Sequence, residues 1–234
     1  MNELNEYIII IAGEQHLYFA ETICEEMALS AQARGTGIAR RTPEYVSAKI
    51  IEGKAVIALT KSGEWAGFCY IETWGHGQYV ANSGLIVAPQ FRKSGLAKAI
   101  KKKIFELSRA KFPAAKIFGL TTGLAVMKIN SELGYEPVTY SELTDDEEFW
   151  KGCRSCVNFD ILQSKERKNC MCTAMLYDPQ EKEKNLPKRN LLDFAKKSKL
   201  YERFMRVKQN ILLKGKKNGV TTEKKKSLLS FFNF

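Results

Sequence analysis

The chain has 234 residues, a formal net charge of +11 and 44% hydrophobic residues. This length and apolar content suit one sizeable domain with a packed core and an appended segment. No apolar run reaches the length of a membrane span, and the acidic N-terminus does not resemble a secretory signal, so we expect a cytoplasmic protein without a transmembrane segment.

The positive charge is concentrated at the C-terminal end. Residues 1–180 carry 21 Lys and Arg against 21 Asp and Glu, whereas residues 181–234 carry 16 against 5. We therefore expect a globular domain over 1–180, without a nucleic-acid signature of its own, and a basic helical and flexible extension over 181–234. That extension is either a solvated helix with a disordered end or a docking element for an acidic partner, RNA or an anionic membrane surface.

The first half of the domain alternates between short apolar runs and amphipathic stretches. Strands are expected at residues 7–12, 55–60, 65–73 and 79–87, and helices at 17–33 and 43–51. Thr42 followed by Pro43 favours the start of the second helix, because a Thr hydroxyl caps free N–H groups and Pro suits the first helical position.

The segment Gly84-Leu-Ile-Val-Ala-Pro-Gln-Phe-Arg-Lys-Ser-Gly-Leu-Ala97 is the most informative stretch. A strand ends near Pro89, and a short basic loop leads into a helix expected at 96–109. Gly95 allows close approach of a ligand, and the N–H groups of residues 93–97 would point outward at the positive end of the helix dipole, which suits a phosphate. The alternative is an ordinary strand–turn–helix with a basic turn.

A strand at 116–121, a helix at 124–133 ended by Gly134, and a strand near 136 complete the predicted order. Arg-x-x-Gly-x-Ala after a strand resembles the coenzyme A pyrophosphate loop of the GNAT acyltransferase superfamily. The segment 130–138 resembles that superfamily's helix followed by Gly and an aromatic residue. The resemblance implies an α/β (α+β) GNAT fold: a mixed central sheet flanked by helices, with a Cys-rich insertion and a basic helical tail.

The same resemblance implies acetyl-CoA or succinyl-CoA as the acyl donor, in an N-acyltransferase or in a protein that kept the fold and lost activity. The implied cofactor-binding residues are Leu85, Ile86, Val87, Arg92, Lys93, Ser94, Gly95, Leu96 and Ala97. Backbone N–H groups of Ile86 and Val87 would polarise the thioester carbonyl.

The expected reaction is direct attack of an amine on the thioester, with the thiolate leaving. The superfamily often places a general-acid Tyr at a position that is Asn130 here, so the thiolate leaves unaided or takes a proton from water. Glu72 and His76 are the candidate bases, and the alternative for each is a surface side chain.

Three segments resemble bacterial N-acetylglutamate synthases: residues 37–44, residues 118–122 with 134–138, and Arg154-Ser155. Glutamate has two carboxylates, so its site needs two separated cationic groups, and Arg can give each a bidentate hydrogen-bond pair. By this resemblance Arg41 binds the α-carboxylate, Arg154 with Ser155 binds the side-chain carboxylate, and Thr121 and Thr122 belong to the acceptor site. The alternative is that both arginines are solvated.

Two functions follow. One is acylation of the α-amine of glutamate or a similar amino acid in arginine biosynthesis. The other is a macromolecule-directed GNAT protein, or an inactive acyl-CoA-binding module, guided by the tail to protein, ribosome or RNA. A homo-oligomer stays open in both.

Four cysteines form a second constellation within residues 150–173. Cys153 and Cys156 are spaced as a zinc knuckle, and Cys170 and Cys172 follow as a closer pair. Two pairs of thiolates suit a tetrahedral structural Zn²⁺, with unliganded thiols or a redox pair as alternatives.

Overall fold

The computed structural model describes residues 6–34 and 41–184, which belong to one compact unit that ends at Lys184. The predicted tail, including its helix at 191–213, lies outside the described residues, and the predicted division of the chain at residue 180 stays a prediction. Across the described ranges no helix is both long enough and apolar enough to cross a membrane.

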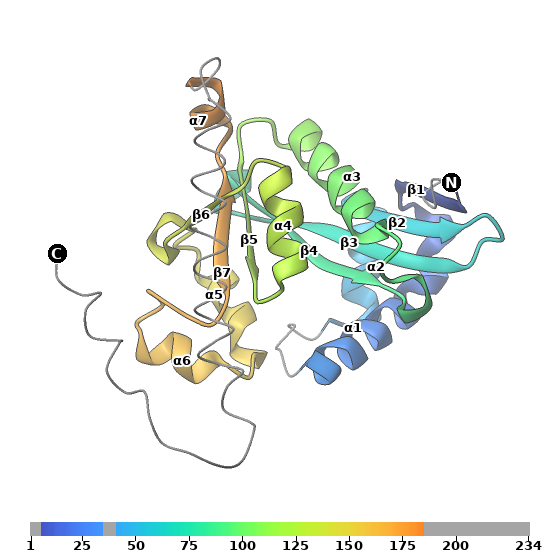
Figure 1. The fold of residues 1–234 in the computed structure, drawn as a ribbon, viewed down its shortest axis with the longest axis horizontal. Helices are drawn as coiled ribbons and strands as arrows, with labels where there is room; N and C mark the ends of the chain where they lie inside the picture. Colours follow the sequence, from blue (N-terminus) through green and yellow to red (C-terminus); the bar gives the residue numbers. More distant parts are fainter. Residues whose placement is uncertain (1–5, 35–40, 185–234) are drawn as a thin grey trace, which may run out of the picture. The chain divides into compact units, whose positions relative to one another are not determined.

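A mixed seven-stranded sheet organises this unit (Figure 1). Its strands are β1 Tyr7–Ile11, β2 Ala55–Thr60, β3 Trp65–Trp74, β4 Tyr79–Val87, β5 Lys116–Thr121, β6 Glu136–Val138 and β7 Thr173–Tyr177. The spatial order is β1-β2-β3-β4-β5-β7-β6. Every neighbouring pair is antiparallel except β4 and β5, which are parallel.

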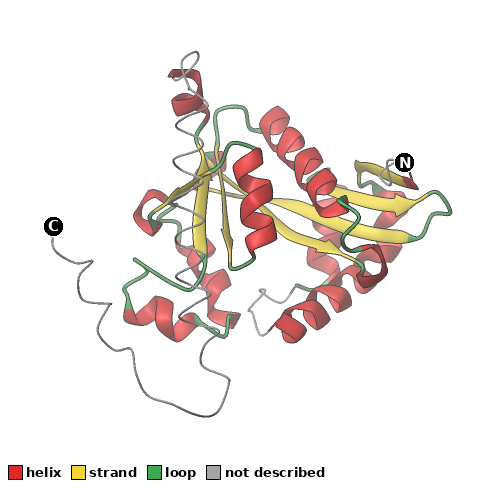
Figure 2. Ribbon diagram, in the orientation of Figure 1, coloured by secondary structure: helices red, strands yellow, loops and turns green. Residues whose placement is uncertain are grey.

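Helices cover both faces of the sheet. The longer ones are α1 Ala20–Arg34, α2 Pro43–Ile51, α3 Leu96–Lys111 and α4 Leu124–Glu132, and the short ones are α5 Glu147–Lys151, α6 Phe159–Ser164 and α7 Pro179–Lys184. In Figure 2, α3 and α4 lie together in front of the strands. The apolar residues of α1 and α2 pack with Phe68 and Tyr70 of β3 on the opposite face.

The apolar core has two clusters on that opposite face. One joins α1 and α2 to β2, β3 and β4, and the other joins β4, β5 and β7 to α5 and α6 around Phe118 and Trp150. Because the second cluster includes Cys153, Cys170 and Cys172, the Cys-rich segment is packed against the sheet rather than held apart from it.

The predicted fold class, a mixed sheet flanked by helices, is confirmed. Two details differ. The predicted helix at 17–33 begins only at Ala20, because Glu14–Phe19 forms a 3-10 helix in which His16 Nδ1 accepts from Gly13 N at 3.0 Å. Strand β7 was not predicted, since its five residues lack a clear alternating pattern.

Candidate functional site

The loop between β4 and α3 is fixed to the body of the domain by Arg92. Its Nε donates to the carbonyl of Val87 at 3.0 Å, and its Nη2 donates to Glu26 and to Ser30 of α1, each at 2.7 Å. These contacts occupy most of the guanidinium. Arg92 therefore holds the loop in place in this structure, and its predicted role as a cofactor ligand stays a prediction.

The same loop presents a row of free backbone donors. Within the described residues, the N–H groups from Lys93 to Ala97 have no hydrogen-bond partner. Lys93 and Gly95 both adopt left-handed backbone conformations, with φ of 67° and 82°. Consecutive N–H groups in such a loop, at the start of the long helix α3, form a concave site for an anion.

Space for that anion is present at Gly95. A Cβ atom built there would meet nothing within 4 Å. Lys93 pays about 1–2 kcal/mol for a backbone conformation that non-glycine residues avoid. The loop thus combines an unfavourable backbone conformation, free N–H groups and open space at Gly95, as a phosphate site requires.

Strands β4 and β5 separate below this loop. They pair only from Tyr79 with Lys116 to Ala81 with Phe118. Beyond that point β4 pairs with β3 alone and β5 with β7 alone, so the two parallel strands part after Ala81 and Phe118, towards their carboxyl ends. We call this place, where the strands no longer pair, the opening. Such positions commonly bind ligands in open α/β sheets.

An irregularity in β4 lies inside this opening. The β3–β4 register shifts between Phe68 and Tyr70, and Gly84 has φ of 63°. A Cβ at Gly84 would come within 2.3 Å of the Tyr70 ring, so only glycine fits there. Leu85 follows the irregularity and is half-buried, whereas Ile86 and Val87 are buried and paired with β3 again.

Glu72 of β3 lies beside the opening, because it pairs with Ala81. It is 8% exposed, and its Oε1 accepts from Tyr45 Oη at 2.5 Å and from Arg41 Nη2 at 3.0 Å. Arg41 Nε also donates to Tyr70 Oη at 2.7 Å. Within the described residues, Glu72 Oε2 and Arg41 Nη1 make no hydrogen bond.

The Glu72 carboxylate and its neighbours shift the pKa values of the cluster so that Arg41 stays charged and the two tyrosines stay neutral. Burial and the Glu72 carboxylate raise the pKa of Tyr45, and the same two causes raise the pKa of Tyr70. Burial opposes the charge of Arg41, but Tyr70 and Glu72 outweigh it and raise the Arg41 pKa above its ordinary value. The cluster is therefore a fixed carboxylate–guanidinium pair with one unused acceptor and one unused donor.

The fold is similar to that of solved acetyltransferases. The Neisseria gonorrhoeae N-acetylglutamate synthase, solved with coenzyme A and N-acetyl-glutamate, superposes with a TM-score of 0.52 and 16% identity over 74% of this chain and 35% of that chain. A Mycobacterium tuberculosis protein solved with CoA and a second ligand gives 0.52 and 15% over 73% and 98%, and the Sinorhizobium meliloti GNAT phosphinothricin acetyltransferase with AcCoA gives 0.51 and 15% over 74% and 88%. The protein has the GNAT fold.

Neither a protein-family model nor a curated protein sequence matches the chain. The chain spans about a third of the length of the Neisseria enzyme. The predicted resemblance to the GNAT superfamily is confirmed at the level of the fold.

Several other predicted site residues now have positions within the GNAT fold. Asn130 of α4 is 1% exposed, and its Nδ2 lies 3.8 Å from the sulfur of Met175. Thr121 ends β5, and its hydroxyl accepts from Gly123 N at 3.0 Å, with Thr122 next to it. His76 is exposed in the β3–β4 turn, at the opposite end of β4 from the β4–α3 loop. The roles predicted for these residues stay predictions.

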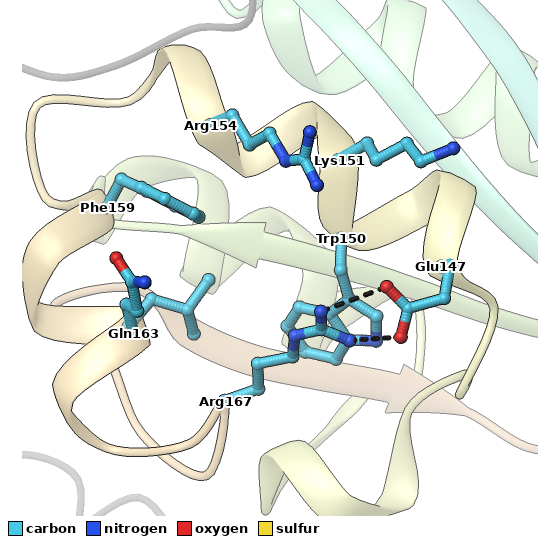
Figure 3. A pocket seen from close by; sticks show the side chains of 8 residues that line it. Glu147, Trp150, Lys151, Arg154, Phe159, Gln163 and Arg167 are labelled. Atoms are coloured by element: carbon cyan, nitrogen blue, oxygen red, sulfur yellow. Dashed lines mark hydrogen bonds and ion pairs between the residues drawn. The ribbon is translucent and has the colours of Figure 1, made fainter.

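Arg154 lines a cavity of about 170 Å³ formed by α5, α6 and the turn between them (Figure 3). Arg167 in this cavity pairs with both oxygens of Glu147, at 2.5 and 2.9 Å, and stacks 5.9 Å from the Trp150 ring. Lys151 contacts Glu148. Among the described cations of the cavity, Arg154 is the one without an ion pair. The side chain of Ser155 lies outside the described part.

Arg41 and Arg154 thus belong to different surroundings. Arg41 is half-buried against Tyr70 and Glu72, whereas Arg154 is exposed beside Trp150. Their predicted shared role in binding one glutamate is untested.

Cys153, Cys170 and Cys172 lie near Tyr140, and Cys156 lies near Cys153. Tyr140 Oη donates to the carbonyl of Cys172 at 3.0 Å, and burial raises the pKa of Cys153 to about 11, with Cys156 and Cys170 adding to the shift. Over the described ranges, however, no group of three or more His, Cys, Asp or Glu side chains is arranged to hold a metal ion. The structure therefore gives structural zinc no support.

Three polar residues of the site were not predicted from the sequence. Tyr45 and Tyr70 were not named in the sequence analysis, although Tyr45 lies three residues after Thr42 and Tyr70 two residues before Glu72. Lys101 of α3 is 2% exposed. It is hidden in the sequence by its neighbours Lys102, which is exposed, and Lys103, which is half-buried, because a run of lysines favours a solvated helix face.

Proposed function

We propose that this protein is an acyl-CoA-dependent N-acyltransferase whose acceptor is glutamate or a similar amino acid, with arginine biosynthesis as its setting. One observation carries the proposal: five consecutive backbone N–H groups, from Lys93 to Ala97, lack partners in the described part, and the space around a Cβ at Gly95 is open. The coenzyme A named for three GNAT-fold neighbours agrees with this reading of the loop.

In the proposed complex the pyrophosphate of coenzyme A occupies the loop at the start of α3, where the helix dipole and the free N–H groups favour negative charge. The acyl arm enters the opening between β4 and β5. The arm then follows β4 past the irregularity at Gly84 and Leu85 to the point where β4 and β5 part, and strand N–H groups would polarise the thioester carbonyl there for attack.

The acceptor amine is proposed to dock at Glu72. The free Oε2 of Glu72 would accept from the substrate ammonium and take its proton, while the free Nη1 of Arg41 would donate to the α-carboxylate. A carboxylate and a guanidinium side by side complement the opposite charges on the α-carbon of an amino acid. This refines the predicted role of Arg41, whose Nη2 is already bound to Glu72.

Specificity for glutamate needs a second cation for the side-chain carboxylate. Arg154 is the proposed residue, because it is the cation of its cavity that has no ion pair in the described part of the chain.

The experiment is a screen of free amino acids against acetyl-CoA and succinyl-CoA, measured as release of the coenzyme A thiol. We expect turnover with glutamate to exceed turnover with glutamine and with amino acids that lack a side-chain carboxylate. Absence of turnover with every free amino acid, although coenzyme A binds, would contradict the acceptor assignment.

A second function is favoured by the tail, with 16 basic and 5 acidic residues over 181–234. In this version the acceptor is a macromolecule that the tail recruits. Deleting residues 185–234 separates the two: turnover of free glutamate should survive the deletion under the first function, and acylation of the macromolecule should be lost under the second.

A further inference from the structure

Lys101 is a buried cation without a counter-charge in the described residues. Its side chain lies on α3 with 2% exposure, and its Nζ donates one long hydrogen bond, 3.5 Å to the carbonyl of Asn82. The remaining contact is with the ring of Tyr135, whose centroid is 5.5 Å away. An ammonium has three donors, and burying it with so few partners is unfavourable unless a ligand supplies what is missing.

The position of Lys101 points to a ligand inside the opening. Asn82, its partner, is the first β4 residue beyond the last β4–β5 pair. The Nζ therefore lies at the point where the two strands part. Asn82 is itself fixed, because its Nδ2 donates to Ser108 at 2.7 Å and its Oδ1 accepts from Tyr135 at 3.1 Å.

A second unused polar group lies at the matching position on β5. Gly119 is the first β5 residue beyond the last pair, and a Cβ there would lie 3.7 Å from Asn130 Nδ2. The Oδ1 of Asn130 is buried and has no hydrogen-bond partner in the described part. Each strand thus has beside it, from the helix that covers it, an under-used polar side chain at the point where the opening begins: Lys101 of α3 beside β4 and Asn130 of α4 beside β5. This indicates that something polar fills the opening.

The length of the coenzyme A arm fits this distance. Arg92 ties the phosphate loop to Val87, and the strand from Val87 to Asn82 spans about 17 Å. The arm from phosphate to sulfur has about 13 bonds and extends to about 15 Å, since three backbone bonds of a peptide span about 3.5 Å. An arm that starts at the loop and follows β4 therefore brings its sulfur close to Asn82.

We propose that Lys101 is the general acid that protonates the departing sulfur, an inference that rests on the proposed function. The acceptor nitrogen forms its bond to the acyl carbon, the carbon–sulfur bond breaks, and its electron pair goes to sulfur. Lys101 transfers a proton to that sulfur and becomes a neutral amine, which later regains a proton from solvent. The proton of the attacking amine leaves by Glu72.

The proton affinity of Lys101 suits this step. Burial lowers the pKa of Lys101 to about 8, close to that of an ordinary thiol at about 8.5. The titratable groups that face it in the described part are Cys69 of β3 and Tyr135. Burial raises the pKa of Cys69 to about 11 and also raises that of Tyr135, so neither titrates near pH 8.

The test compares Lys101→Met with Lys102→Met, the adjacent exposed lysine of α3, in the full-length chain. We expect Lys101→Met to reduce kcat by about 10²- to 10⁴-fold and to bind desulfo-CoA, which lacks the sulfur, within about twofold of wild type. The wild-type kcat should fall as pH rises above about 8, and this limb should be absent in Lys101→Met. Lys102→Met should match wild type throughout.

Three outcomes would overturn the proposal: a Lys101→Met kcat within about threefold of wild type, an unchanged pH limb, or a matching loss of desulfo-CoA affinity, which would make Lys101 a binding or packing residue. Lys101→Gln, which keeps a polar side chain, repeats the test if the Met variant misfolds. If wild-type protein binds neither CoA nor desulfo-CoA, both the proposed function and the Lys101 proposal fail. If wild type binds both and turns over normally while Lys101→Met does the same, only the Lys101 proposal fails.

Discussion

Two buried ionisable side chains, Glu72 and Lys101, flank the opening between β4 and β5. They differ in how well their charges are matched by hydrogen-bond partners and counter-charges. Glu72 receives hydrogen bonds from Arg41 and Tyr45 on the α1–α2 face, and its charge is matched by a guanidinium 3.0 Å away. Lys101 on the α3 face has a carbonyl at 3.5 Å and, within the described residues, no carboxylate.

This difference separates two uses of a buried charge. A paired charge with fixed neighbours is positioned in advance, so Glu72 and Arg41 can bind a charged substrate with little rearrangement. A buried charge without a partner lowers the stability of the folded protein for as long as the site is empty. A protein keeps such a charge where ligand binding or chemistry depends on it. The predictions below test both halves of this contrast.

The largest effect is expected at Arg41. Arg41→Ala should lower kcat/KM for every α-amino acid by about 30- to 1,000-fold, because the shared α-carboxylate loses a charge-assisted partner worth about 2–4 kcal/mol. It should also lower the melting temperature, since Glu72 is left buried without its cation.

Glu72→Gln is the matched control that separates loss of activity from the loss of stability expected in Arg41→Ala. Its amide oxygen can still accept from Arg41 and Tyr45, so the cluster keeps its shape while the negative charge for the substrate amine is removed. Activity should fall with only a small change in melting temperature. Near wild-type kcat/KM in both variants would make the cluster purely structural.

The next effect concerns stability at Lys101. Its pKa is lowered on folding from about 10.5 to about 8, so the unfolded chain holds the proton more tightly and the folded state is penalised below pH 8. Lys101→Met should therefore be more stable than wild type at pH 7, by about 3 kcal/mol. The gap should close as pH rises from about 8 towards about 10.5.

Denaturant unfolding at pH 7 and pH 9.5 measures this gap, with Lys102→Met as the exposed control. A Lys101→Met protein that is less stable than wild type at pH 7 would show that the lysine contributes to the fold, contrary to the contrast with Glu72.

A smaller effect is expected at Arg154. Because this side chain is exposed, its loss should change kcat/KM for glutamate by about tenfold, with little change for glutamine. The ratio of the two kcat/KM values reports the effect, and Lys151→Ala is the control from the same cavity. An unchanged ratio in Arg154→Ala would leave the side-chain carboxylate without an assigned partner.

The sequence predicted the parts of this molecule that rest on local patterns. The strand–loop–helix around Gly95 was predictable, because an apolar run, a basic loop and an amphipathic helix each leave a local signal. The 3-10 helix at Glu14–Phe19 and the short strand β7 were not, since neither has a distinct period.

Long-range pairing was also beyond the sequence. Arg41 and Glu72 were predicted as separate functional residues, and their hydrogen bond depends on how α2 packs on β3. Lys101 sits in a run of three lysines, and only the packing of α3 on β4 makes it the buried one. Metal-ligand spacing at the four cysteines was a local signal that the packing around Tyr140 does not support.

The central claim is that the loop at Gly95 binds the phosphates of coenzyme A, and calorimetry of coenzyme A binding to Gly95→Val tests it most directly. Gly63→Val is a closely matched control: Gly63 has φ of 86° against 82° at Gly95, and a Cβ at either position meets nothing within 4 Å. Both variants should therefore carry the same backbone strain, about 1–2 kcal/mol. We predict that Gly95→Val loses coenzyme A binding and that Gly63→Val keeps it. Equal affinities in the two variants would contradict the assignment of this loop.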